Sequence, residues 1–200
     1  MKIDKEIIQN FFQNIIKECH KLESEIDFVS LIEAKKIIME CKRKNNRIHI
    51  TGIGKPSYVA GYIASLFSSI GIPAYKLDGT EAVHGSAGQV EQGDVVIAIS
   101  NSGQTKELLY TITTLIKNGA RIIAVTGNVD SWLGKHCDIC IKAAVEQEGD
   151  KLNLAPRNSI LKEIILLQSL SILLQNEIHL SIEDYVKWHP GGELGKKLEK

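Results

Sequence analysis

The chain has 200 residues, and its 24 lysine and arginine residues balance 24 aspartate and glutamate residues, so the formal net charge is zero. A chain of this length can form one domain whose core needs no disulfide or metal for stability. The balanced charge gives no electrostatic reason to expect a nucleic acid or an anionic membrane surface as a partner.

No segment suggests insertion into a membrane. The first ten residues lack the apolar run of a secretion signal, and no window approaches the roughly 18 to 20 apolar residues that span a bilayer. We therefore expect a cytoplasmic protein. Cys19 and Cys41 fall in helical patterns. Cys137 and Cys140 lie in a strand-like stretch, where residues three apart face opposite sides. We expect buried free thiols rather than a redox or zinc pair.

Two helices are predicted in the amino-terminal region, residues 1–45. Apolar residues recur three and four positions apart over residues 3–22, which indicates a helix with a wide apolar stripe that packs on a broad surface. A second helix is expected over residues 28–43, because the basic residues at its end suit a helix C-terminus.

Strand and helix patterns alternate in the remainder of the chain. The expected strands are residues 47–53, 74–77, 95–99, 121–125 and 139–143, and the expected helices are residues 58–70, 108–117 and 159–176. The strand at 95–99 is apolar on both faces, which is typical of a parallel sheet covered by helices on both sides. We predict a single α/β domain over residues 1–200, with the α/β core and the carboxyl-terminal helices in residues 46–200.

A hydroxyl-rich loop, Ser100-Asn101-Ser102-Gly103-Gln104-Thr105, lies between an expected strand and an expected helix. Its hydroxyl groups and its glycine bring several hydrogen-bond donors to one point, and the helix N-terminus adds free N–H groups and partial positive charge. The loop therefore predicts a phosphate site and an anionic substrate. The alternative is that Ser102 only caps the helix.

A second turn, Gly52-Ile53-Gly54-Lys55, follows the first expected strand, where doubly wound folds bind ligands. Gly52 and Gly54, together with Asp78, resemble the start of a dinucleotide fingerprint, but Ser57 stands where the third glycine belongs. A lysine beside a phosphate fits the turn better. An exposed lysine without a ligand remains the alternative.

Several titratable residues lie in expected loops. Glu81 and His84 are three residues apart on a loop or short turn, and Glu107 stands in the first turn of a helix, where a carboxylate is stabilised even without a catalytic task. Glu148 belongs to an acidic loop, a pattern that usually means solvated charge. His189 lies between a tryptophan and a Pro-Gly-Gly turn, so it is held rather than loose, either for catalysis or as a structural histidine.

Six motifs occur in one order, and together they resemble the sugar isomerase (SIS) domain of arabinose-5-phosphate isomerases over roughly residues 47–198. They are Gly52-x-Gly54-Lys55, Glu81-x-x-His84-Gly85, Ser100-Asn101-Ser102-Gly103, Thr126-Gly127-Asn128, Leu154-Ala155-Pro156 and His189-Pro190-Gly191-Gly192-x-Leu194-Gly195. The last motif points to this branch of the family.

The resemblance implies a flavodoxin-like three-layer αβα sandwich with a five-stranded parallel sheet, preceded by N-terminal helices. It also implies a homotetramer with sites shared between subunits, a sugar-phosphate substrate, and no required metal or cofactor. Longer relatives carry a pair of CBS modules after this domain, which these 200 residues do not include.

The resemblance also assigns roles to residues. The implied catalytic residues are Glu148, His189, Lys55, Glu107 and His84. The implied phosphate-binding residues are Ser100, Asn101, Ser102 and Thr105, and the implied substrate-binding residues are Gly54, Ser57 and Glu81.

The implied reaction interconverts D-ribulose 5-phosphate and D-arabinose 5-phosphate by moving a proton between C1 and C2 through an enediolate. Glu148 is the expected base. His189 would shuttle the oxygen proton or help to open the cyclic sugar, and Lys55 would stabilise the developing negative charge.

Two alternatives stay open. Pro56, Ser86 and Arg157 depart from the family pattern near the expected site, which leaves room for another substrate such as a hexulose 6-phosphate. The alternative of another class is a non-catalytic sugar-phosphate sensor. Such a sensor is normally joined to a DNA-binding segment, and the sequence contains no helix-turn-helix pattern.

Overall fold

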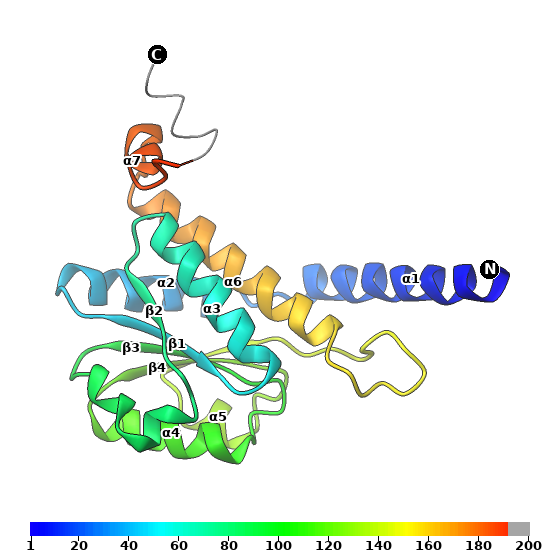
Figure 1. Cartoon of the computed structure of the whole chain (residues 1–200), viewed down its shortest axis with the longest axis horizontal. Helices are drawn as coiled ribbons and strands as arrows, with labels where there is room; N and C mark the ends of the chain where they lie inside the picture. The colour runs from blue at the N-terminus through cyan, green and yellow to red at the C-terminus, as the bar shows by residue number, and fades with distance from the viewer. Residues whose placement is uncertain (192–200) are drawn as a thin grey trace.

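The computed structural model describes residues 1–191, in which five strands form one parallel sheet, as expected (Figure 1). The strands are β1 (Ile48–Gly52), β2 (Ala74–Lys76), β3 (Val95–Ile99), β4 (Arg121–Thr126) and β5 (Ile139–Lys142). Their order across the sheet is β2-β1-β3-β4-β5. The order in which strands are added to the sheet reverses between β1 and β3, and the carboxyl ends of strands at such a switch point leave a crevice for ligands.

Helices cover both faces of the sheet and complete the three-layer sandwich. One core cluster joins the sheet to α2 (Phe28–Arg43), α3 (Lys55–Ser69) and α6 (Asn158–Glu177). The other joins it to α4 (Lys106–Lys117), α5 (Trp132–Lys135) and the short 3₁₀ helices η1 (Glu81–His84) and η2 (Ser86–Gln89). The side chains of β3 alternate between the two clusters, because neighbours along a strand face opposite sides.

The first helix, α1 (Lys2–Glu25), projects beyond the sandwich (Figure 1). The structure describes all of α1, and its buried residues are Glu18 and Leu22. The apolar residues of its outer part are 48% to 72% exposed: Ile3, Ile7, Ile8, Phe12 and Ile16. Within residues 1–191 the expected packing is therefore found only for the inner part of α1, which contacts α6, whereas the outer part covers no other element. We call these five residues the α1 stripe.

The sequence pattern missed the short elements. Besides η1, η2 and α5, these include α7 (Ile182–Lys187), and none of them is long enough to show a helical period. The helix α3 begins at Lys55, three residues earlier than expected, because a proline is well tolerated in the first turn of a helix.

The cysteines are free, but burial was wrong for Cys19, which is exposed on α1. Cys41 is buried, and Cys137 and Cys140 are half-buried. Cys137 precedes β5, so the argument from opposite strand faces does not apply to it. Among the helices of residues 1–191, none combines the length and hydropathy needed to cross a membrane.

Candidate functional site

Loops from several strands meet at the carboxyl edge of the sheet. Gly52, the last residue of β1, is in register with Ile99, the last residue of β3. The N–H of Gly127, after β4, donates to the carbonyl of Asn101 at 2.9 Å. The loop between β3 and α4 is thus fixed from both sides at the switch point.

That loop, residues 100–105, folds tightly around its first serine. The hydroxyl of Ser100 is buried, accepts a hydrogen bond from the N–H of Gly103 at 3.2 Å and lies 3.3 Å from the hydroxyl of Thr105. Gly103 has a φ of 63°, and a Cβ there would overlap Ser131 and lie 2.9 Å from Thr126 Oγ1. The turn therefore requires glycine.

The structure rejects the interpretation of Ser102 as the helix cap. The N-cap of α4 is Thr105, whose side chain makes no capping hydrogen bond, and the Ser102 hydroxyl accepts from the N–H of Gln104 at 3.2 Å. Asn101 and Ser102 are exposed. The loop thus places an exposed serine hydroxyl and an exposed asparagine amide just before a helix N-terminus, which is an arrangement suited to an anion.

The turn after β1 begins α3. Gly54 is the N-cap of this helix, and its carbonyl accepts from the hydroxyl of Ser57 at 2.7 Å, so that hydroxyl also serves the local turn. Lys55 is the first residue of α3, and its side chain is exposed. Its ammonium group can therefore reach toward a ligand above the sheet edge.

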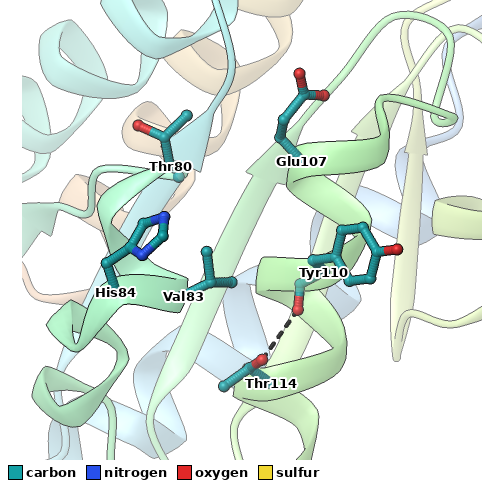
Figure 2. Close-up of a pocket in the computed structure, with 7 residues that line it drawn as sticks. Thr80, Val83, His84, Glu107, Tyr110 and Thr114 are labelled. Carbon is teal, nitrogen blue, oxygen red and sulfur yellow. Dashed lines mark hydrogen bonds between the residues drawn. The ribbon is translucent and has the colours of Figure 1, made fainter.

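A cavity of about 640 Å³ lies between η1 and α4, and Figure 2 shows His84 and Glu107 on its two sides. Glu107 comes from the first turn of α4, and His84 ends η1. Glu81, at the start of η1, is exposed, and its N–H donates to Asp78 Oδ1 at 3.1 Å. The structure thus brings His84 and Glu107 to one cavity. The other residues that line this cavity are Gly79, Thr80, Val83, Tyr110 and Thr114.

Glu148 is buried, at 7% exposure, so the interpretation as solvated charge was wrong for this residue, whereas Glu146 of the same loop is exposed. Its Oε2 accepts from the N–H of Arg157 at 2.6 Å and from that of Ser159 at 3.1 Å, and its own N–H donates to Asn153 Oδ1 at 2.5 Å. A carboxylate at a helix N-terminus is stabilised by the orphan N–H groups and the helix dipole. Glu148 therefore caps α6 through one oxygen.

Lys55 and Glu148 lie at the same edge of the domain. The helices α3 and α6 run side by side in the same direction (Figure 1), and Gln168 Nε2 donates to the hydroxyl of Tyr62 at 2.8 Å between them. Their amino-terminal ends consequently both lie toward the carboxyl edge of the sheet, with Lys55 in the first turn of α3 and the Glu148 carboxylate at the start of α6.

His189 lies elsewhere. Its Nδ1 donates to the carbonyl of Tyr185 at 2.6 Å, and its ring stacks on the Tyr185 ring at 4.1 Å between centroids. Its neighbour Trp188 packs on Gly71, just before the amino end of β2. In a parallel sheet this is the edge opposite the loop 100–105, so the structure does not bring His189 to the other site residues of its own chain. Gly192, Leu194 and Gly195 of its motif lie outside the described residues.

Three buried charged residues of α1 and α6 were not predicted as functional. Glu18 on α1 is 3% exposed, and Lys162 and Glu163 on α6 are 4% and 1% exposed. Burial, with a contribution from the charge of Glu148, raises the pKa of Glu163 to about 8. The signal in the sequence was a charged residue at an apolar position of a helix, as at 162 and 163. Among residues 1–191, no three His, Cys, Asp or Glu side chains group as a metal site requires.

Comparison with known proteins gives concordant matches. The family model of the SIS domain matches residues 43–173. The chain is similar to the arabinose 5-phosphate isomerase KdsD of Francisella tularensis, with 35% identity over 187 residues that cover 94% of this chain and 57% of that protein. It is similar to the arabinose 5-phosphate isomerase KpsF of Escherichia coli, with 30% identity over 199 residues, 98% of this chain and 62% of that protein. The chain thus spans less than two thirds of these curated relatives.

A solved structure agrees over nearly the whole chain. The c3406 protein of E. coli CFT073, solved in complex with arabinose 5-phosphate, superposes with a TM-score of 0.87 at 31% sequence identity. The match covers 94% of this chain and 98% of that one.

Proposed function

We propose that this chain, which belongs to the SIS domain family, is an aldose–ketose isomerase that interconverts D-ribulose 5-phosphate and D-arabinose 5-phosphate. The observation that carries the proposal is the buried carboxylate of Glu148, held through one oxygen at the sheet edge where the loop 100–105 also lies. A phosphate site and a fixed carboxylate at one edge are what a phosphosugar isomerase needs.

The choice of sugar is supported by the relatives. Two curated relatives are arabinose 5-phosphate isomerases, and c3406 is solved with arabinose 5-phosphate. In this chain the phosphate would bind at Ser100, Asn101, Ser102 and Thr105, where hydroxyl groups and the N-terminus of α4 provide donors. The turn with Gly54 and Ser57, together with Glu81, would contact the rest of the sugar.

The chemistry follows from the remaining side chains. Glu148 would remove the proton from C1 of the ketose or C2 of the aldose and return it at the neighbouring carbon. The ammonium group of Lys55 would stabilise negative charge on the enediolate, which is most effective when it is preorganised. Glu107 and His84, on the two sides of the neighbouring cavity, would assist transfer of the oxygen proton.

The site would be completed by a second subunit. His189 lies at the opposite edge of its own sheet, so it can act on the sugar only at the site of another copy. The exposed α1 stripe supports such an assembly, because large apolar patches usually mark a contact with another protein. We propose a homotetramer with shared sites.

The test is an exchange assay. Purified protein is incubated in deuterated water with ketose and aldose phosphates, including pentose 5-phosphates and hexulose 6-phosphates, and deuterium at C1 and C2 is followed by NMR. We expect exchange with the ribulose and arabinose 5-phosphates, and a loss of about 10²- to 10⁴-fold in turnover in Glu148→Gln. Unchanged turnover in the variant would refute the role of Glu148. Binding without exchange for every sugar would indicate a sensor instead.

A further inference from the structure

The segment that carries Glu148 is held by a buried carboxylate from α1. Glu18 Oε1 accepts hydrogen bonds from the N–H groups of Glu146 and Gln147, both at 3.0 Å. These two residues directly precede Glu148. Because Glu18 is 3% exposed, water does not compete for its oxygen, and the two bonds fix the course of the backbone into Glu148.

A lysine of α6 completes this arrangement. Lys162 Nζ lies 3.2 Å from Glu18 Oε2 and donates to the carbonyl of Ala144 at 2.5 Å. Both side chains of this ion pair are buried, so each charge is compensated by the other rather than by water. Glu18 and Lys162 therefore hold the segment 144–147 together. Glu18 binds two of its N–H groups, and Lys162 binds one of its carbonyl groups. We call this pair the α1–α6 clamp.

The helix α1 also contacts the residue after Glu148. Gly149 has a φ of 104°, and a Cβ there would lie 2.5 Å from the ring of Phe11. On the other side, Asn158 Nδ2 donates to the carbonyl of Gln147 at 2.8 Å and to Asn14 Oδ1 at 2.5 Å. Residues of α1 thus contact the backbone on both sides of Glu148, although α1 contributes no residue to the expected site.

We propose that Glu18 is a positioning residue for Glu148: by accepting the two backbone N–H groups before it, Glu18 fixes the carboxylate in its reactive position, while Lys162 compensates the buried charge of Glu18. This inference rests on the proposed isomerase function. It gives α1 a role in positioning Glu148 besides its place on the outer surface. A contact that rearranged α1 would displace Glu148 through Glu18.

The reason for expecting an effect on rate is geometric. A misplacement of about 1 Å in a reacting group can lower a rate by about 10²-fold, and residues that orient metal ligands contribute about 10- to 100-fold by the same geometric effect. In the proposed site the phosphate of the substrate binds at the loop 100–105, which the clamp does not contact. Loss of the Glu18 acceptor should consequently lower kcat and leave KM nearly unchanged.

Two double variants separate positioning from general stability. Glu18→Met with Lys162→Met removes both buried charges and leaves the two N–H groups without an acceptor. Glu18→Gln with Lys162→Met also removes both charges, but the glutamine carbonyl still accepts from them. Neither variant contains an unpaired buried charge, which would by itself be strongly destabilising.

We expect kcat to fall by about 10- to 100-fold in the Met/Met variant with KM within about twofold, and to stay within about threefold of the native value in the Gln/Met variant. Equal kcat values in the two variants would overturn the proposal. A loss expressed in KM alone would also overturn it. Thermal unfolding of both variants shows whether each is folded at the assay temperature.

Hydrogen exchange followed by mass spectrometry separates failure of this inference from failure of the proposed function. Peptides that cover residues 144–150 should exchange faster in the Met/Met variant than in the Gln/Met variant. If the native protein catalyses no isomerisation, the proposed function fails, and the clamp is judged by this exchange alone. Equal exchange in the two variants refutes the clamp whatever the activity.

Discussion

Glu163 provides the sharpest test of the electrostatics of this fold. It is 1% exposed, neither of its oxygens has a hydrogen-bond partner among the described residues, and its pKa is raised from an ordinary value of 4.5 to about 8. Burial is the main cause, and the charge of Glu148 adds to it. Near neutral pH the carboxyl is therefore protonated in the folded chain and ionised in the unfolded one.

The direction in which stability changes with pH follows from proton binding. Because the folded chain binds the Glu163 proton more tightly, its contribution to stability is fully present below about pH 4.5 and is lost as the pH rises to about 8. At about 1.36 kcal/mol per pH unit, the free energy of unfolding should fall by about 3 kcal/mol between about pH 5 and about pH 8 through this group. Glu163→Gln abolishes the titration and should remove this fall.

The assay is urea unfolding followed by circular dichroism at several pH values, with native and variant proteins at the same concentration so that association affects both equally. Glu163→Gln leaves a buried amide without partners, so its stability should be lower at acidic pH, but its dependence on pH should be flatter. Glu23→Gln, on the exposed face of α1, is the control and should keep the native slope. Parallel curves for native protein and Glu163→Gln would refute the reasoning.

Two further changes test the loop and the surface. Gly103→Ala forces a side chain onto a backbone with a φ of 63° and against Ser131, so the free energy of unfolding should fall by about 2 to 4 kcal/mol; an unchanged midpoint of urea unfolding would contradict the tight turn. Phe12→Glu places a charge in the α1 stripe and should shift sedimentation velocity profiles toward smaller species, whereas Gln13→Glu, at the next position, should not; identical profiles for both would show that the stripe is not an interface.

The parallel sheet followed directly from the sequence, because each strand depends on a local pattern. The run Val95 to Ile99 is apolar at every position, and such a run is stable only between two layers of helices. The loop 100–105 could be predicted equally well, since its glycine and hydroxyl groups lie within six consecutive residues. Local patterns therefore predicted the phosphate end of the expected site.

Contacts between residues far apart in the sequence could not be predicted from such local patterns. The role of Glu148 at the start of α6 depends on N–H groups nine and eleven positions further along the chain, and nothing in the acidic loop itself indicates burial. Glu18 reaches the same segment across 128 residues. The position of His189 depends on how Trp188 packs on Gly71, which only the tertiary structure determines.

The single-oxygen attachment of Glu148 has a stereochemical consequence. Oε2 is occupied by two N–H groups at the start of α6, so the carboxylate cannot rotate freely about its axis, and in the proposed reaction it would approach the sugar from one side. A planar enediolate has two faces, and a base confined to one of them delivers the proton to that face alone. The handedness of the aldose at C2 would then be decided by the backbone at the beginning of one helix.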